Sequence, residues 1–146
     1  MPRSQYKHMS PYESVLWDQY LFKFRDYFEG FEYDVRVGEG QISPGVTNPV
    51  YVEAGMKLTQ KRIDAVGKRT GEVWIYEVKA NAGLSALGQL IAYRDLYVRQ
   101  FVPQATMTLA IVTDFMNRDE EFLFVKQGIR IFLYPEAADV WAQMSL

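Results

Sequence analysis

The sequence predicts an α/β fold with a mixed central β-sheet flanked by helices. A capped, largely apolar segment near the N-terminus has the pattern of a helix, and residues 31–80 combine strand patterns with glycine-rich turns. A second helical segment at 84–101 leads to the nearly continuous apolar run 107–113, which is typical of a central strand covered on both faces. The predicted order is helix, strand, strand, strand, helix, strand, helix, strand.

Length and composition indicate a single globular domain. The chain has 146 residues, of which 49% are hydrophobic and 23% charged. We expect a flexible tail at residues 1–9 and one domain at residues 10–146. No apolar run approaches the roughly 20 residues that span a bilayer, and a signal-peptide core is missing, so we expect a cytoplasmic protein without membrane contact.

The residue types restrict the chemistry. The chain has no cysteine, which excludes disulfides, thiolate zinc sites, iron–sulfur clusters and a cysteine nucleophile. It has one histidine, which leaves little room for histidine acid–base chemistry. Any metal ion must therefore be held mainly by oxygen atoms.

The first helix is expected from Ser10 to about Phe28. Ser10 has the position of an N-cap, Pro11 the first helical position, and Glu13 the position that completes a capping box. Apolar residues cover more than one stripe of this helix, so we expect it to be packed on two sides.

Three strands should follow the helix. Residues 31–37 alternate apolar and charged side chains, as in an antiparallel or edge strand. A loop at 38–49 leads to a strand at 50–66, and the sequence Gly-Lys-Arg-Thr-Gly at 67–71 is expected to turn the chain into a strand at 72–80. The last two strands would form a β-hairpin.

The second half of the chain alternates helices and strands. The predicted segments are a turn at 81–83, a helix at 84–101, a strand at 107–113, a short helix at 117–128, a strand at 129–134 and a terminal helix at 135–146.

Three ionisable residues lie inside otherwise apolar strands: Asp64, Glu77 and Lys79. A charge that leaves water without a partner costs several kcal/mol. Two carboxylates that converge also repel each other unless a cation lies between them, and hard ions such as Mg²⁺ prefer oxygen ligands. The pattern therefore favours a metal site, with a structural ion pair between Asp64 and Lys79 as the alternative.

The hairpin register decides whether this site can form. If Val66 pairs with Val73, Asp64 shares a sheet face with Glu77 and Lys79, as their diagonal neighbour. If Val66 pairs with Glu72, Asp64 points to the other face. We expect the first register.

Basic residues are concentrated beside the hairpin. Residues 57–69 contain five basic residues and one acid, although the whole chain has a net charge of −2. This excess is explained equally well by contacts with phosphates and by a solvated hairpin.

Together these residues resemble the PD-(D/E)xK nuclease superfamily, whose core has the order αβββαβ. Ile63-Asp64 takes the place of the Pro-Asp element, and Glu77-Val78-Lys79 matches the (D/E)xK element. Gln89 and Tyr93, four residues apart on the second helix, match the QxxxY element of the RecB-like branch. The resemblance covers roughly residues 10–115 and implies a restriction-endonuclease-like fold.

The resemblance implies a Mg²⁺- or Mn²⁺-dependent deoxyribonuclease that hydrolyses phosphodiester bonds. The implied metal ligands are Asp64, Glu77 and the backbone carbonyl of Val78, with Lys79 as a catalytic residue. Gln89 and Tyr93 would support Lys79 or contact DNA, unless they only pack on the sheet. Glu13 would be an additional ligand, although we expect it mainly to complete the capping box. The implied DNA contacts are Arg62, Lys68, Arg69 and Arg94.

Two further readings stay open. A non-catalytic module that binds nucleic acid or assembles virions would retain the same fold, and an unrelated α/β interaction domain is a third reading. We expect DNA and a divalent metal as partners, leave a homo-oligomer open, and regard a phage origin, with residence in the host cytoplasm, as a hypothesis from chain size.

Overall fold

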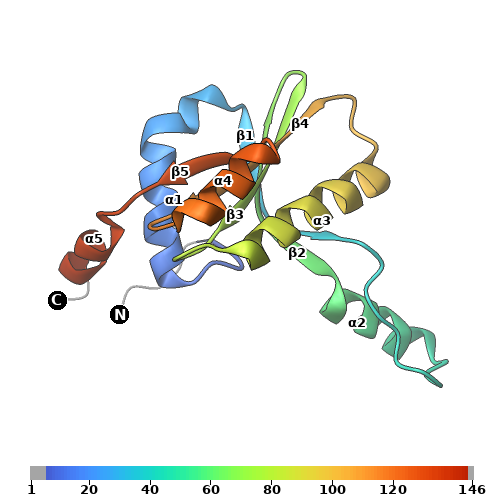
Figure 1. Ribbon diagram of the computed structural model, residues 1–146. Helices are drawn as coiled ribbons and strands as arrows, with labels where there is room; N and C mark the ends of the chain where they lie inside the picture. The colour runs from blue at the N-terminus through green and yellow to red at the C-terminus, as the bar shows by residue number, and fades with distance from the viewer. Residues whose placement is uncertain (1–5, 145–146) are drawn as a thin grey trace.

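The computed structural model describes residues 6–144 as a five-stranded sheet with the strand order β1-β2-β3-β4-β5 (Figure 1). The elements, in chain order, are α1 (Pro11–Phe24), the 3-10 turn η1 (Arg25–Tyr27), β1 (Gly30–Val37), α2 (Pro49–Thr59), β2 (Lys61–Arg69), β3 (Glu72–Val78), α3 (Leu84–Phe101), β4 (Thr106–Thr113), α4 (Arg118–Lys126), β5 (Arg130–Leu133) and α5 (Ala137–Met144).

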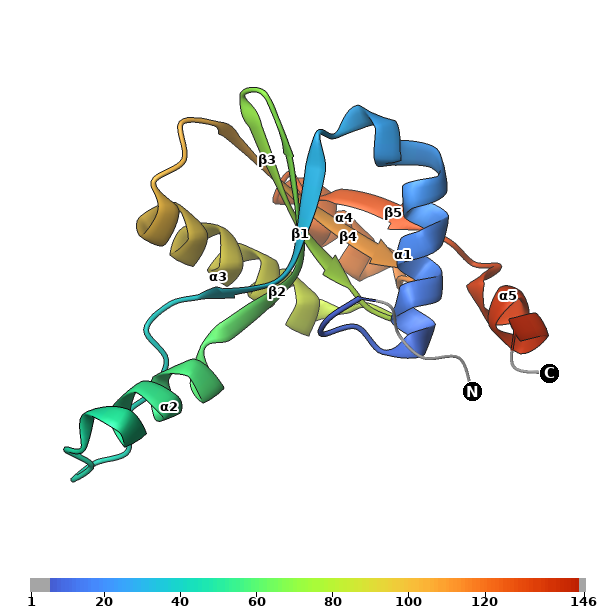
Figure 2. The ribbon, with the colours of Figure 1, turned by 180° about the vertical axis from the view of Figure 1, so that it is seen from behind.

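The sheet is mixed, which confirms the predicted fold class. β1, β2 and β3 are antiparallel neighbours, and β4 and β5 continue the sheet in parallel with β3. One hydrophobic core cluster joins the sheet to α3 and α4, and a second joins its other face to α1 and α5. The helices thus form layers on both faces (Figures 1 and 2), and the core order αβββαβ is present once α2 is set aside.

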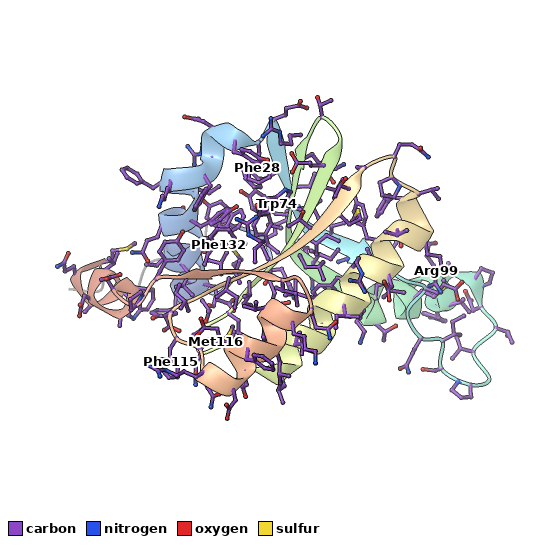
Figure 3. All side chains as sticks on the ribbon, turned by 45° about the horizontal axis from the view of Figure 1, so that its top comes forward. Phe28, Trp74, Arg99, Phe115, Met116 and Phe132 are labelled. Carbon is purple, nitrogen blue, oxygen red and sulfur yellow. The ribbon has the colours of Figure 1, made fainter. Side chains whose placement is uncertain are left out.

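Helix α1 forms as its sequence predicts. The Ser10 side chain accepts the backbone N–H of Glu13, and the Glu13 carboxylate accepts the backbone N–H of Ser10, which completes the capping box. The buried side of α1 packs aromatic rings against the sheet. Phe28, Trp74 and Phe132 gather between this helix and the strands (Figure 3).

The hairpin register differs from the predicted one by two residues. Val66 pairs with Ile75, and only Thr70 and Gly71 form the turn, where Gly71 has a φ of +78°. Gly67 lies inside β2, at a position where a Cβ would meet the rings of Phe28 and Phe31 at 3.0–3.1 Å. The shift of two residues keeps side chains on their faces. It places Asp64 level with Glu77 instead of diagonal to it.

The prediction of a strand at residues 50–59 is wrong, because this segment is helix α2. The Asn48 side chain accepts the backbone N–H of Val50 at 2.9 Å, and Pro49 takes the first helical position. These two capping signals outweigh the strand-like run Val-Tyr-Val that follows. The strand starts only at Lys61.

Two residues of the segment predicted to be a flexible tail, Tyr6 and Met9, contact the domain, whereas Lys7 and His8 are exposed. Met9 is buried in the core cluster of α1, and the Tyr6 hydroxyl donates a hydrogen bond to the Asp18 carboxylate. Residues 1–5 of the predicted tail, and residues 145–146 of the predicted last helix, lie outside the described residues. Within residues 6–144 no helix combines the length and apolarity needed to cross a bilayer.

Replacing Gly67 by valine should destabilise the protein, because the new side chain would push into the rings of Phe28 and Phe31. We expect a loss of about 1–3 kcal/mol in the free energy of unfolding, measured by urea denaturation. Gly30→Val is the matched control, because a Cβ at Gly30 has nothing within 4 Å. Equal stability of the two variants would contradict this packing.

Candidate functional site

The candidate site lies where the side chains of β1 and β2 stop alternating regularly between the two faces of the sheet. On β2, Ile63 and Val66 belong to the core cluster under α3, whereas Ala65 belongs to the cluster under α1. In a regular strand, residues 63 and 65 would share a face. Asp64 lies at the position where β2 changes its facing.

The partner strand β1 changes its facing at the same level. Asp34 lies between the pairs Tyr33–Ala65 and Val35–Ile63, and it has a left-handed φ of +55°. Its carboxylate accepts two hydrogen bonds from the Arg62 guanidinium, at 2.6 and 2.7 Å, and this pairing lowers the pKa of Asp34. The ion pair ties the two strands together next to Asp64.

The Asp64 carboxylate replaces a ladder hydrogen bond. Backbone pairing between β2 and β3 reaches Ala65 and Tyr76, and beyond it the N–H of Val78 donates to Asp64 Oδ2 at 2.8 Å. This contact directs Asp64, which is 5% exposed, towards the end of β3 that carries Glu77. The two carboxyl groups interact directly, as the predicted site requires, although the predicted pairing of the strands was wrong.

Burial and proximity make both carboxyl groups hard to ionise. Loss of solvent, and then the charge of Glu77, raise the pKa of Asp64 to about 9. Burial also raises the pKa of Glu77. The direct interaction of the two groups raises the pKa of Asp64 and lowers that of Glu77, so a shared proton is favoured on Asp64.

Two other predicted site residues influence Glu77. The hydroxyl of Tyr93, which is buried on α3, interacts with the Glu77 carboxylate and lowers the pKa of that group. The positive charge of Lys79, which is half-buried at the end of β3, acts in the same direction. The structure therefore brings Asp64, Glu77, Lys79 and Tyr93 together.

Two buried oxygen atoms of the predicted site lack a hydrogen-bond partner. Among the described residues three buried side-chain atoms are unpartnered, and two of them are Glu77 Oε2 and Gln89 Oε1. Native proteins satisfy nearly all buried polar atoms, and the exceptions call for an explanation such as an ion. The third atom, Gln19 Oε1, belongs to α1.

The donor set fits a hard divalent cation. Asp64 and Glu77 supply carboxylate oxygens, and the buried Glu77 Oε2 has a free acceptor position. No cluster of three or more acidic, histidine or cysteine side chains suited to a metal occurs within residues 6–144. An ion at this place would complete its shell with backbone oxygen and water, as Mg²⁺ commonly does.

Glu13 has two roles in the electrostatics of this region. It completes the capping box of α1, as expected, and its negative charge also raises the pKa of both Asp64 and Glu77. The N-terminal turn of α1 therefore lies near the carboxylate pair.

A polar clasp at the ends of β3 and β4 was not recognised in the sequence. Asp114 accepts the backbone N–H of Asn81 at 2.7 Å and the hydroxyl of Tyr12 at 2.7 Å. The Thr113 hydroxyl accepts the N–H of Ala82 at 3.1 Å. These bonds fix the loop behind Lys79 and the first turn of α1. Because parallel strands end at one edge of a sheet, Thr113-Asp114 after the apolar run 107–112 was the available signal.

The four basic residues proposed to contact DNA all have acidic partners. Arg62 pairs with Asp34, Lys68 with Glu32 at 2.7 Å, Arg69 with Glu72 at 3.3 Å, and Arg94 with Asp95 at 3.0 Å. Lys68 and Arg69 lie at the hairpin tip, roughly 13–17 Å along β2 from Asp64. The expected positive excess beside the site is thus largely neutralised by acids, two of which lie on β1.

Searches with the sequence find no matching family model and no matching curated protein. The fold is similar to that of solved structures. A repair endonuclease from Pyrococcus abyssi superposes with a TM-score of 0.51 at 19% identity, over 84% of this chain and 46% of the other. A structure of an EndoMS–dsDNA complex superposes with a TM-score of 0.50 at 16% sequence identity, and the match covers 91% of this chain and 48% of that one. A protein of unknown function, AF1548, superposes with a TM-score of 0.51 at 18% sequence identity, and the match covers 82% of this chain and 56% of that one. The chain spans about half the length of these proteins, and at these identities the similarity shows a common fold.

Proposed function

We propose that this chain is a metal-dependent DNA nuclease that hydrolyses phosphodiester bonds. The observation that carries the proposal is the buried pair of Asp64 and Glu77, with Lys79 beside it. Its support is the similarity of the fold to a repair endonuclease and to the EndoMS structure in complex with double-stranded DNA. Perturbed, clustered carboxyl groups are characteristic of catalytic sites.

Asp64, Glu77 and the backbone carbonyl of Val78 are the proposed ligands of Mg²⁺ or Mn²⁺. The unpartnered Glu77 Oε2 and the all-oxygen donor set support this assignment. A divalent ion held there would supply charge neutralisation for a phosphate oxygen and would lower the pKa of a water molecule towards neutral pH. Glu13 is proposed as an additional acidic group of the site, because its charge reaches both carboxylates.

The remaining side chains would position the substrate and the attacking water. We propose that the Lys79 ammonium orients the water and stabilises charge on the phosphorus. Tyr93, which contacts Glu77, and Gln89, with its unpartnered oxygen, would support the site as the QxxxY pair of a RecB-like nuclease. Lys68, Arg69 and Arg94 would contact phosphates by exchanging their acidic partners, because exposed ion pairs are weak. Arg62 would contact a phosphate while it keeps its bond to the largely buried Asp34. A phage origin remains a hypothesis from chain size.

Without metal, the protein should lose stability as the pH rises. The folded-state pKa of Asp64 lies above its unfolded value, so its contribution is fully present below about pH 4 and is lost up to about pH 9. We expect urea denaturation in the presence of a chelator to show a larger decline between about pH 5.5 and pH 8.5 for the wild type than for Asp64→Asn. The comparison cancels the titration of other groups. Identical declines would show that Asp64 ionises freely.

Mg²⁺ or Mn²⁺ should raise the unfolding temperature of the wild type, because binding to the folded state alone stabilises it. At a metal concentration about ten times the dissociation constant the gain is about 1.4 kcal/mol, or roughly 3–6 °C for a domain of this size. Asp64→Asn and Glu77→Gln should lose most of this shift. Glu121→Gln, a change at a partly exposed residue of α4, is the control. Equal shifts in all four proteins would place the metal elsewhere.

Purified protein with Mg²⁺ or Mn²⁺ should cleave DNA. Linear, circular and single-stranded substrates should each be tested, beside Glu77→Gln and Lys79→Met. We expect each variant to lose at least about 100-fold in rate, the usual effect of removing one transition-state contact. Cleavage that both variants retain would come from a contaminant. Folded, metal-binding protein without cleavage of any substrate would favour the non-catalytic module.

A further inference from the structure

Helix α2 and the loop before it form an arm that projects from the domain. Both ribbon views show α2 extending away from the sheet and from the other helices (Figures 1 and 2). All eleven residues of α2 are described, and none of them is buried. The arm leaves the domain between Val37 of β1 and Lys61 of β2.

The base and the loop of the arm are well ordered by hydrogen bonds. Gln60 Nε2 donates to the Gly38 carbonyl at 2.7 Å, and Gln100 on α3 accepts the N–H of Gly38 at 3.0 Å. The Thr59 hydroxyl bonds to backbone groups of Gln41 and Gly55. Gly40, at a φ of +74°, lies so close to the Met56 carbonyl that a Cβ would overlap it. The arm is therefore held in a defined conformation by its own hydrogen bonds and by the contact with α3.

Such a helix has little stability of its own in water. Isolated helices shorter than about 12–15 residues are marginal even when their residues favour helix formation. This one includes two valines and a glycine, which favour helix formation weakly. Contacts with another surface would supply the missing stabilisation.

The solvent-facing side of α2 is apolar. Val50, Ala54 and Leu58 follow one another at intervals of four residues, and Tyr51 lies beside them. The exposed fractions of Val50, Tyr51 and Leu58 are 71%, 67% and 83%. These four residues are called the α2 stripe below. Glu53 and Lys57 flank it and pair with each other at 3.3 Å.

The charges of α2 favour a protein surface over nucleic acid. Lys57 is its one basic residue, and Glu53 balances that charge. Binding to DNA relies on several uncompensated cations. An apolar stripe with one balanced charge pair has the composition of a helix–helix contact.

We propose that a second copy of this chain covers the α2 stripe, so that two α2 helices pack antiparallel about a two-fold axis. In such an antiparallel pair, each flank of one helix lies against the same flank of the other helix. Glu53 then lies opposite the partner's Lys57, and Lys57 opposite the partner's Glu53. The surface is thus complementary to itself, as an isologous contact requires. The proposal does not depend on the nuclease assignment.

The contact is small, so the dimer is weak. An 11-residue helix is about 16 Å long. An interface built from two such helices lies at the low end of specific interfaces, and we expect a micromolar dissociation constant.

Sedimentation of the full chain over a range of concentrations tests the proposal. The wild type, 17.0 kDa as a monomer, should approach twice this mass at high concentration. Leu58→Glu should abolish association, and Glu53→Lys and Lys57→Glu should each weaken it at least tenfold, with circular dichroism confirming the fold. Lys126→Glu, an exposed change on α4, should leave association unchanged.

Mixing the two charge variants is the decisive experiment. One chain then carries two lysines and the other two glutamates at these positions, so a mixed dimer restores both pairs and should form more tightly than either homodimer. A wild type that stays monomeric throughout, or a mixture that associates no better than its components, would overturn the proposal. Association that the Leu58→Glu variant retains would also overturn it. So would a protein that stays monomeric and loses affinity for DNA when Tyr51 is replaced by glutamate.

Discussion

The repulsion between two buried carboxyl groups is the constraint on which the rest of this structure depends. Asp64 is 5% exposed and Glu77 is 8% exposed, and they influence each other directly. A fold selected for stability alone would place apolar residues at both positions. The surrounding chain instead holds the pair in place with a strand break, a capped helix and a polar clasp.

These supports come from distant parts of the chain. The bidentate pair of Arg62 and Asp34 joins β1 to β2 where both strands change their facing. Asp114 joins the loop behind Lys79 to the N-terminal turn of α1. Both ties are short hydrogen bonds to a carboxylate, which are stronger than neutral ones. These ties order the segments on either side of the carboxylate pair, and positional precision is what ligand groups for a metal require.

Most of the fold could be predicted because its signals are local. The capping box of α1, the apolar run of β4 and the 18-residue pattern of α3 each identify an element without tertiary context. The error at α2 arose because Val50, Tyr51 and Val52 favour strands, whereas the Asn48 cap starts a helix. The predicted hairpin register was wrong by two residues because Gly67 was assigned to the turn, whereas it lies in β2 against the rings of Phe28 and Phe31, which are distant in the sequence.

The sequence indicates the residues of the candidate site but not the contacts that surround them. Charges inside apolar strands single out Asp64, Glu77 and Lys79, and the spacing of four relates Gln89 to Tyr93. The partners of Arg62 and Lys68 lie on another strand, so local charge counting overestimated the positive excess. The Tyr12–Asp114 bond joins residues 102 positions apart, which no local pattern reveals.

The most direct test of the central claim is a crystal structure of the protein grown with Mn²⁺, with the ion located by anomalous scattering. The account predicts one ion within about 2.0–2.3 Å of a carboxylate oxygen from both Asp64 and Glu77, with Val78 contributing its carbonyl. An ion bound elsewhere, or the two carboxylates turned to opposite faces of the sheet, would contradict it.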